Sequence, residues 1–88
     1  MHFILLVRFK EKPTKKSIAD NLKKIEAEKK EGITYSAIWW TLGKYDAIAL
    51  CEAPNEKVLM KASIGRSDFM NIESLVAVPA EEARKLVE

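Results

Sequence analysis

Strand-like and helix-like segments follow one another along this chain in an order that few folds accommodate. Four segments rich in β-branched and aromatic residues favour strands, at residues 2–9, 33–42, 45–52 and 71–78. Helical spacing of apolar residues favours one helix after the first strand and another at residues 56–64. A short final helix follows Pro79. The order β-α-β-β-α-β predicts an α+β ferredoxin-like plait with sheet order 4-1-3-2, antiparallel between neighbours.

The first helix is expected to start between Thr14 and Ser17 and to end at Gly32. Ser17 and Asp20 fit the S-x-x-D capping box, and glycine is favoured just after the last helical turn. Three apolar residues at helical spacing form the stripe of this helix: Ile18, Leu22 and Ile25. In the second helix, Asn55 is the expected N-cap.

Length and composition limit the kinds of protein that fit. A chain of 88 residues makes one small domain, taken as residues 1–88. The single cysteine excludes an internal disulfide, and the single histidine argues against a His-rich metal site. The sequence contains no phosphate-loop motif, which argues against a nucleotide cofactor. The net charge is +2, and Lys and Glu are interleaved over residues 23–31 as on a solvated helix face, which argues against a nucleic-acid partner.

The longest apolar run, residues 3–7, is too short to cross a membrane, and no signal peptide is recognisable. We expect a cytoplasmic domain without cofactor or metal that binds neither nucleic acid nor membrane.

A dipeptide with glycine first, Gly43-Lys44, predicts a two-residue type II′ turn between the second and third strands. The turn sets the cross-strand pairs, which are Leu42 with Tyr45, Thr41 with Asp46, Trp39 with Ile48 and Ala37 with Leu50. The first strand is expected to lie antiparallel beside the third, which adds two neighbours at the strand ends, Arg8 with Asp46 and His2 with Glu52.

This register sorts the sheet into two faces. The face assigned to the helices carries large residues beside small ones, namely Phe3, Leu5, Val7 and Phe9 beside Ala47, Ala49 and Cys51. The other face stays apolar through its middle and carries Ile4, Leu6, Ala37, Trp39, Ile48 and Leu50. A solvated face should alternate toward polar residues, and an apolar patch of this size requires a cover. Only the short C-terminal helix is left over in the chain, so we expect a second copy to cover this face. The result would be a C2 dimer built as a dimeric α+β barrel, or a higher even-numbered assembly.

The candidate ligand-binding residues are Arg8, Tyr35, Trp39, Tyr45 and Asp46. Arg8 and Asp46 are expected at one end of this second face and Tyr35 at the other, with Trp39 on the same face between them. Tyr45 and Asp46 either hold a ligand at the barrel mouth or serve the turn, and aspartate beside a tight turn ordinarily serves the turn. Arg8 either pairs with Asp46 across the strands or binds a ligand carboxylate with two hydrogen bonds. Trp39 is expected at the dimer interface or in a pocket wall, and Trp40 in the core under the helices.

Two motifs carry a family resemblance that covers nearly the whole chain. Residues 38–46 read I-W-W-T-L-G-K-Y-D, and residues 73–82 read E-S-L-V-A-V-P-A-E-E. Together they resemble the GYD-domain family of small bacterial and archaeal proteins, whose name-giving residues match Gly43, Tyr45 and Asp46. Residues 65–69 depart from the usual lead-in to the last strand of that family. A looser similarity exists to the effector-binding domain of leucine-responsive regulators, which has a similar hairpin and binds amino acids between subunits. These resemblances imply a dimeric α+β barrel and no specific reaction.

Three functions remain open at this point. The sequence favours a small-molecule-binding or scaffold homodimer without catalysis of its own, whose ligand would be a small, amino-acid-like anion at a subunit junction. The alternative is a cofactor-independent enzyme of the dimeric α+β barrel type, resembling a monooxygenase or an isomerase. An enclosed cavity lined by Tyr35, Trp39 or Tyr45 would favour the enzyme, a pocket between copies would favour the binding protein, and a filled barrel would favour the scaffold.

Overall fold

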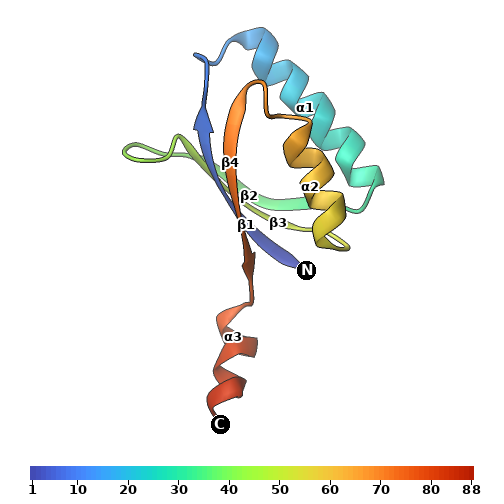
Figure 1. The fold of residues 1–88 in the computed structure, drawn as a ribbon, viewed down its shortest axis with the longest axis vertical. Helices are drawn as coiled ribbons and strands as arrows, with labels where there is room; N and C mark the ends of the chain where they lie inside the picture. The colour runs from blue at the N-terminus through green and yellow to red at the C-terminus, as the bar shows by residue number, and fades with distance from the viewer.

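The structure is a computed structural model that describes residues 1–88 (Figure 1). Its elements are β1 (His2–Phe9), α1 (Lys15–Lys30), β2 (Thr34–Trp40), β3 (Ala47–Glu52), α2 (Glu56–Ile64), β4 (Met70–Ala77), α3 (Ala80–Ala83) and the 3₁₀ helix η1 (Arg84–Val87). The sheet order is β2-β3-β1-β4, and every neighbouring pair is antiparallel. This arrangement confirms the expected α+β ferredoxin-like plait.

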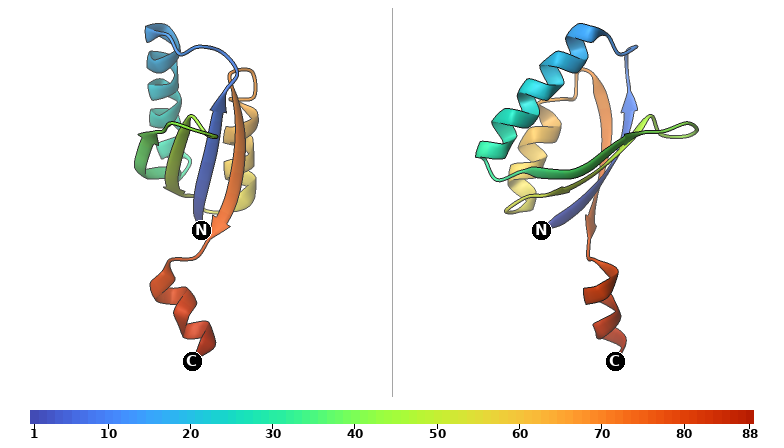
Figure 2. Two further views of the ribbon diagram at one scale, coloured as in Figure 1. Left: turned by 90° about the vertical axis from the view of Figure 1, so that its left-hand side faces the viewer. Right: turned by 180° about the vertical axis from the view of Figure 1, so that it is seen from behind.

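Two layers form the body of the molecule, with α1 and α2 on one face of the sheet and no element of the chain on the other (Figure 2). We call these the helix face and the open face. The pairing of β1 with β3 places Phe3 opposite Cys51 and Leu5 opposite Ala49 on the helix face. Large side chains beside small ones leave room for the helices, as the sequence predicts. None of the helices is long and apolar enough to cross a lipid bilayer.

The open face has the apolar composition expected of it. Its residues are Ile4, Leu6, Ala37, Trp39, Ile48, Leu50 and, from β4, Leu75. The pairs Trp39 with Ile48 and Ala37 with Leu50 have the predicted register. The Trp39 side chain is 58% exposed. A wide apolar surface on the sheet is thus left without a cover from its own chain.

A β-bulge in β2 overturns the predicted position of one candidate residue. The register shifts between Tyr35 and Ala37, so that Tyr35 lies opposite Cys51 while Ala37 lies opposite Leu50. The extra residue is Ser36, whose hydroxyl donates to the carbonyl of Leu50. Because side chains alternate along a strand, one extra residue reverses the side to which its neighbours point. Tyr35 therefore lies on the helix face and not on the open face as expected.

The loop between β2 and β3 is wider than the predicted two-residue turn and projects from the sheet (Figure 1). Backbone pairing stops at the bond from the Thr41 amide to the Asp46 carbonyl. The connecting loop therefore comprises residues 42–45. Gly43 has φ +102°, a conformation that side-chain-bearing residues rarely adopt. The glycine is needed for the loop, although the turn type differs from the prediction.

The two longer helices, α1 and α2, begin at side-chain caps. The cap of α1 is Thr14, whose hydroxyl accepts from the Ser17 amide while the Ser17 hydroxyl accepts from the Thr14 amide. The capping box thus joins Thr14 to Ser17, and the predicted pairing of Ser17 with Asp20 is wrong. Asn55 caps α2 through the Val58 amide, as expected. Gly32 follows α1 with φ +93°, which confirms the predicted left-handed end of this helix.

The core lies between the helices and the middle of the sheet and is small. Its nine buried apolar residues are Phe3, Leu5, Val7, Ile33, Ala47, Ala49, Cys51, Ala53 and Leu59. The predicted burial of Trp40 is wrong, because this side chain lies on the helix face but is 61% exposed. Two residues of the α1 stripe, Ile18 and Leu22, are exposed as well. All three side chains line the same opening between α1 and the sheet. The spacing of apolar residues predicts which side of an element faces the core, but it does not predict an opening on that side.

Candidate functional site

A cleft of about 490 Å³ opens between α1 and the neighbouring part of the sheet. It lies where the N-terminal half of α1 stands clear of the end of β2, and residues of the segment between α2 and β4 also line it. Its volume falls within the range of pockets that bind small molecules, about 300–1,000 Å³. The cleft is therefore the candidate binding site of this molecule.

The walls of the cleft are largely apolar and come from three parts of the chain. These wall residues are Ile18, Leu22 and Ile25 of α1, Phe9, Ile38 and Trp40 of the sheet, and Phe69 and Met70. The rings of Phe9 and Trp40 meet edge to face with their centroids 5.4 Å apart. Apolar walls of this kind favour a ligand with an apolar body.

Charged side chains surround the mouth of the cleft, namely Glu11, Lys12, Lys16, Asp20 and Lys24. Lys24 is already engaged, because its Nζ donates to the Gly65 carbonyl at 3.1 Å and lies 5.2 Å from the centre of the Phe69 ring. Lys12 and Lys16 take part in none of the ion pairs of the molecule. Their ammonium groups are therefore available to an anionic group at the mouth.

A smaller cavity of about 70 Å³ adjoins the cleft on the side of the sheet. Asn21, Ile25 and Arg66 line both cavities. The smaller cavity extends to Tyr35 and to the small side chains of the sheet, including Ala49. Asn21 and Arg66 thus form the polar floor of the cleft, and Tyr35 lies beyond them in the smaller cavity.

A buried ion pair connects this floor to the C-terminal end of α1. Arg66, which follows α2, and Glu28, near the C-terminal end of α1, are both buried. The two terminal nitrogens of the guanidinium each donate to a different carboxylate oxygen of Glu28, one of them over 2.8 Å. Arg66 Nε donates to Asn21 Oδ1 at 2.8 Å, and the Tyr35 hydroxyl donates to Glu28 Oε1 at 3.0 Å. No buried side-chain nitrogen or oxygen of the molecule lacks a partner. Every polar group of this network is therefore satisfied within the chain.

The network shifts the proton affinities of its members and of a neighbouring thiol. Burial raises the pKa of the Tyr35 phenol well above its usual range; Arg66 opposes this rise and Glu28 adds to it. Burial, with a contribution from Glu28, raises the pKa of Cys51 to about 11. For Arg66 burial acts to lower the pKa, but the hydrogen bond and charge of Glu28 together with Tyr35 raise it overall. At neutral pH Tyr35 and Cys51 are protonated and Arg66 is charged.

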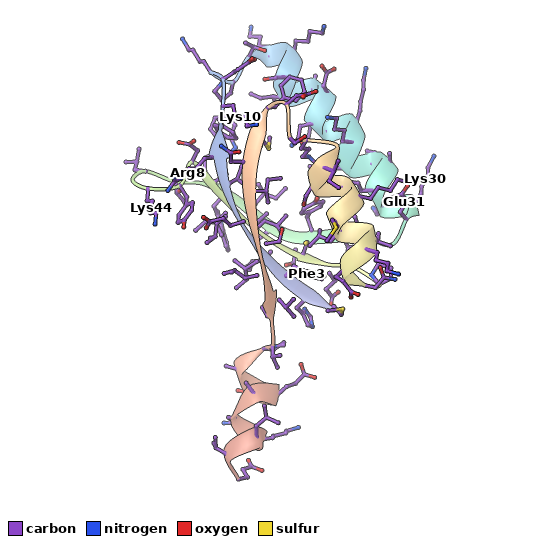
Figure 3. All side chains as sticks on the ribbon, in the orientation of Figure 1. Phe3, Arg8, Lys10, Lys30, Glu31 and Lys44 are labelled. Atoms are coloured by element: carbon purple, nitrogen blue, oxygen red, sulfur yellow. The ribbon has the colours of Figure 1, made fainter.

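The predicted ion pair between Arg8 and Asp46 is not formed. Asp46 Oδ2 accepts from the Phe9 amide at 2.7 Å, so the carboxylate satisfies the backbone where β1 leaves the sheet. Arg8 Nε donates to the Lys44 carbonyl at 3.1 Å, and its guanidinium lies 5.3 Å from the centre of the Tyr45 ring. Asp46 therefore binds the backbone amide of Phe9, and the guanidinium of Arg8 lies against the Tyr45 ring. Figure 3 shows Arg8 and Lys44 at the end of the sheet where this loop projects.

The other predicted residues are divided between the two faces. Tyr45 donates to Glu73 Oε2 at 2.8 Å, and it lies with Arg8 at one end of the open face. Trp39 lies in the middle of that face. Neither Trp39 nor Tyr45 lines the cleft or the adjoining cavity, and Tyr35 lines only the latter. The five predicted residues therefore do not form one site.

Sequence reasoning missed Asn21, Glu28 and Arg66. A signal for two of them exists, because Asn21 and Glu28 lie four residues before and three residues after Ile25, on the apolar stripe of α1. A polar residue on such a stripe indicates a buried partner. Arg66 has no comparable signal, since it lies in a segment between two elements whose path the sequence does not predict.

No three His, Cys, Asp or Glu side chains are grouped so as to hold a metal ion. Comparison with curated proteins finds no match to this chain. A family model described as a domain of unknown function, DUF3303, matches residues 1–88. Since the match spans the whole chain, the protein belongs to the DUF3303 family.

Proposed function

We propose that this protein is a small-molecule-binding homodimer without catalysis of its own, and that its ligand lies in the cleft beside α1. The observation that carries the proposal is the cleft itself, about 490 Å³ in volume with apolar walls and unpaired lysines at its mouth. The ligand is an apolar molecule with one anionic group, such as a carboxylate. The ligand is still an anion, as the sequence predicts, but the proposed site is on the helix side of one subunit and not at a subunit junction.

The chemistry of the cleft floor supports binding over catalysis. A general base or acid must offer a free position to its substrate. Both carboxylate oxygens of Glu28 already accept hydrogen bonds, and the raised pKa of Tyr35 keeps its phenol protonated. A cofactor-independent enzyme remains the alternative, and turnover of the bound molecule would favour it.

The homodimer is supported by the open face. A sheet surface that contains Trp39, Leu50 and Leu75 in contact with water is unfavourable for a protein that stays a monomer. A second copy supplies a complementary apolar surface by symmetry. The resemblance to the GYD-domain family stays a prediction, and the proposal does not depend on it.

Native mass spectrometry of freshly purified protein tests both parts of the proposal. We expect a dimer that carries a small molecule, whose mass then identifies it. A monomer would contradict the homodimer. A protein without adduct that also fails to bind decanoate, a simple apolar carboxylate, would contradict the binding function.

Two adjacent tryptophans offer a matched pair of reporters for the site. Trp40 lines the cleft, whereas Trp39 lies on the opposite face of the sheet. In the Trp39→Phe variant, decanoate should change the emission of the remaining Trp40 in a saturable way. In the Trp40→Phe variant, the remaining Trp39 should not respond. Equal responses of the two variants would show that the acid binds elsewhere.

The role of the charged mouth is tested with Lys16 and Lys23, two lysines of α1. Lys16 lines the cleft and Lys23 does not. Lys16→Gln should weaken decanoate binding by about two- to fivefold, as expected for one exposed ion pair. It should leave the binding of decanol unchanged, because the alcohol carries no charge. Lys23→Gln is the control, and an equal effect of both variants would contradict a specific role of the mouth.

A further inference from the structure

The C-terminal segment, residues 78–88, forms an arm that projects from the end of β4 away from the rest of the molecule (Figure 1). Both further views agree that neither α3 nor η1 returns to the sheet or to the other helices (Figure 2). Isolated helices shorter than about 12–15 residues are marginal in water. A helical arm as short as α3 with η1 therefore needs a surface against which to fold.

One side of the arm is apolar and exposed. Ala83 and Leu86 lie three positions apart, which is one turn of a 3₁₀ helix, so they share a side of η1, and Val87 follows directly after Leu86. Leu86 is 83% exposed and Val87 is 89% exposed. Figure 3 shows the side chains of the arm extending into open space, with no other element nearby. These side chains have no apolar partner within their own chain.

The exposed area of the chain is large for its mass. The 10.0 kDa chain exposes 6574 Å², whereas a compact monomer of this mass exposes about 5,200 Å². The excess of about 1,300 Å² is more than the ~800 Å² that each partner buries in an interface of standard size. The unburied surface is thus sufficient for a stable interface.

The arm follows directly on a strand that contributes to the open face. Leu75 and Ala77 belong to the open face side of β4, and the arm starts directly after that strand. A second copy seated on the open face therefore extends toward the arm. Two-fold symmetry then brings the arm of the second copy to the first in the same way.

We propose that two copies of this chain exchange their C-terminal arms, so that each arm packs its apolar side against the partner subunit and extends the interface formed by the open face. The inference rests on the proposed homodimer and adds to it the element that completes the interface. The arm packs against a second copy of the same chain and not against an unrelated protein, because it follows directly on the open face and the exposed area of the chain suffices for an interface of standard size.

Sedimentation velocity tests the arm with a pair of double variants. Replacing Leu86 and Val87 with serine should raise the dimer dissociation constant by about tenfold or more, since both side chains leave the interface. The control replaces Glu82 and Lys85 with serine, which alters the same arm and leaves the net charge unchanged. The control should dimerise like the natural chain.

A crosslinking experiment on the full chain tests the exchange with a substitution that keeps position 86 apolar. A photoreactive phenylalanine analogue at position 86 is placed in a mixture of nitrogen-14 and nitrogen-15 protein. If the arm contacts the partner, pairs of crosslinked peptides should include nitrogen-14 with nitrogen-15 pairs, in the proportion expected when the two kinds of chain form dimers at random. Crosslinks confined to single-isotope pairs would show that the arm folds back on its own chain.

The outcomes separate the two proposals. A natural chain that is monomeric at micromolar concentration overturns both the homodimer and the arm exchange. A dimer whose dissociation constant is equal in the two double variants, or whose arm gives no crosslink between isotopes, overturns the arm exchange and leaves the homodimer in place.

Discussion

At the scale of single residues, the buried pair of Arg66 and Glu28 links three parts of the chain. Glu28 belongs to α1, Arg66 follows α2, and Tyr35 of β2 completes the contacts of the carboxylate. A charged pair taken out of water is expensive, so this pair serves to hold parts in a defined arrangement more than to add stability. Its position beneath the cleft means that it sets how far α1 stands from the sheet.

Removing one partner of this pair should be costly. Arg66→Met leaves the Glu28 carboxylate buried without a counter-charge, and we expect a loss of about 3–5 kcal/mol in the free energy of unfolding. The exposed pair of Lys61 with Glu31 at 3.2 Å is the control, and Lys61→Met should cost less than about 1 kcal/mol. Urea unfolding of both variants measures the difference, and similar losses would contradict the structural role of Arg66.

Alkaline pH should destabilise the fold through Cys51 and Tyr35. In the folded chain the pKa of Cys51 is raised from its ordinary 9.0 to about 11, and that of Tyr35 is raised in the same direction. A raised pKa means that the folded state holds its proton more tightly than the unfolded state does. This stabilisation is complete below pH 9 and is lost as the pH rises from about 9 to about 11. Urea unfolding across this range should show the decline, and Cys51→Ala should make it shallower; an unchanged slope in that variant would contradict the assignment.

At the scale of elements, the two ends of α1 are held differently. Its C-terminal half carries Glu28, and its N-terminal half is tied to Arg66 through Asn21, whereas its first turn stands beside the cleft and begins at the Thr14 cap. The stability of the first turn therefore rests on the hydrogen bonds of the cap more than on packing.

Thr14→Ala should lower the free energy of unfolding by about 1 kcal/mol, the usual effect of losing an N-cap. Amide hydrogen exchange should accelerate in residues 15–21 more than in residues 25–30. Asn55→Ala, which removes the cap of α2, is the control and should leave this difference within α1 unchanged. A uniform acceleration along α1 after Thr14→Ala would show that the helix opens as one unit.

The elements and their order could be predicted from the sequence because strand and helix periodicities are local, and the sheet order follows from the hairpin and the handedness of crossovers. The bulge in β2 could not be predicted, because the residue type at Ser36 does not distinguish an extra, unpaired residue from a normally paired one. The cleft could not be predicted either, because the distance of α1 from the sheet depends on Arg66, a residue in an irregular segment. The stripe residues Ile18 and Leu22 therefore looked like core residues although they line an opening.

At the scale of the whole molecule, the open face is an apolar sheet surface that the chain leaves uncovered. Two copies that bring these faces together would bury Leu50 and Ile48 in the centre of the interface. Assembly and folding would then be coupled, so the midpoint of thermal unfolding should rise with protein concentration.

Leu50→Glu should convert the dimer to a monomer, because it places a charge without a counter-charge in the interface. Met60→Glu is the control, since it makes the same kind of change at an exposed apolar residue of α2, away from the open face. Sedimentation velocity distinguishes the two variants. A Leu50→Glu variant that remains a dimer of normal stability would show that the sheet faces do not meet.

The bulge at Ser36 shifts, within β2, which residues point to the helix face: Tyr35 does so before the bulge, and Ile38 and Trp40 do so after it. As a result Tyr35, Ile38 and Trp40 all reach the helix side, which a regular strand could not achieve with this spacing. If β2 paired regularly through residue 36 at the same length, Tyr35 would point to the opposite face, and the carboxylate of α1 would need a hydroxyl from elsewhere. We therefore expect related chains that combine a tyrosine at position 35 with a glutamate at position 28 to keep the bulge in β2.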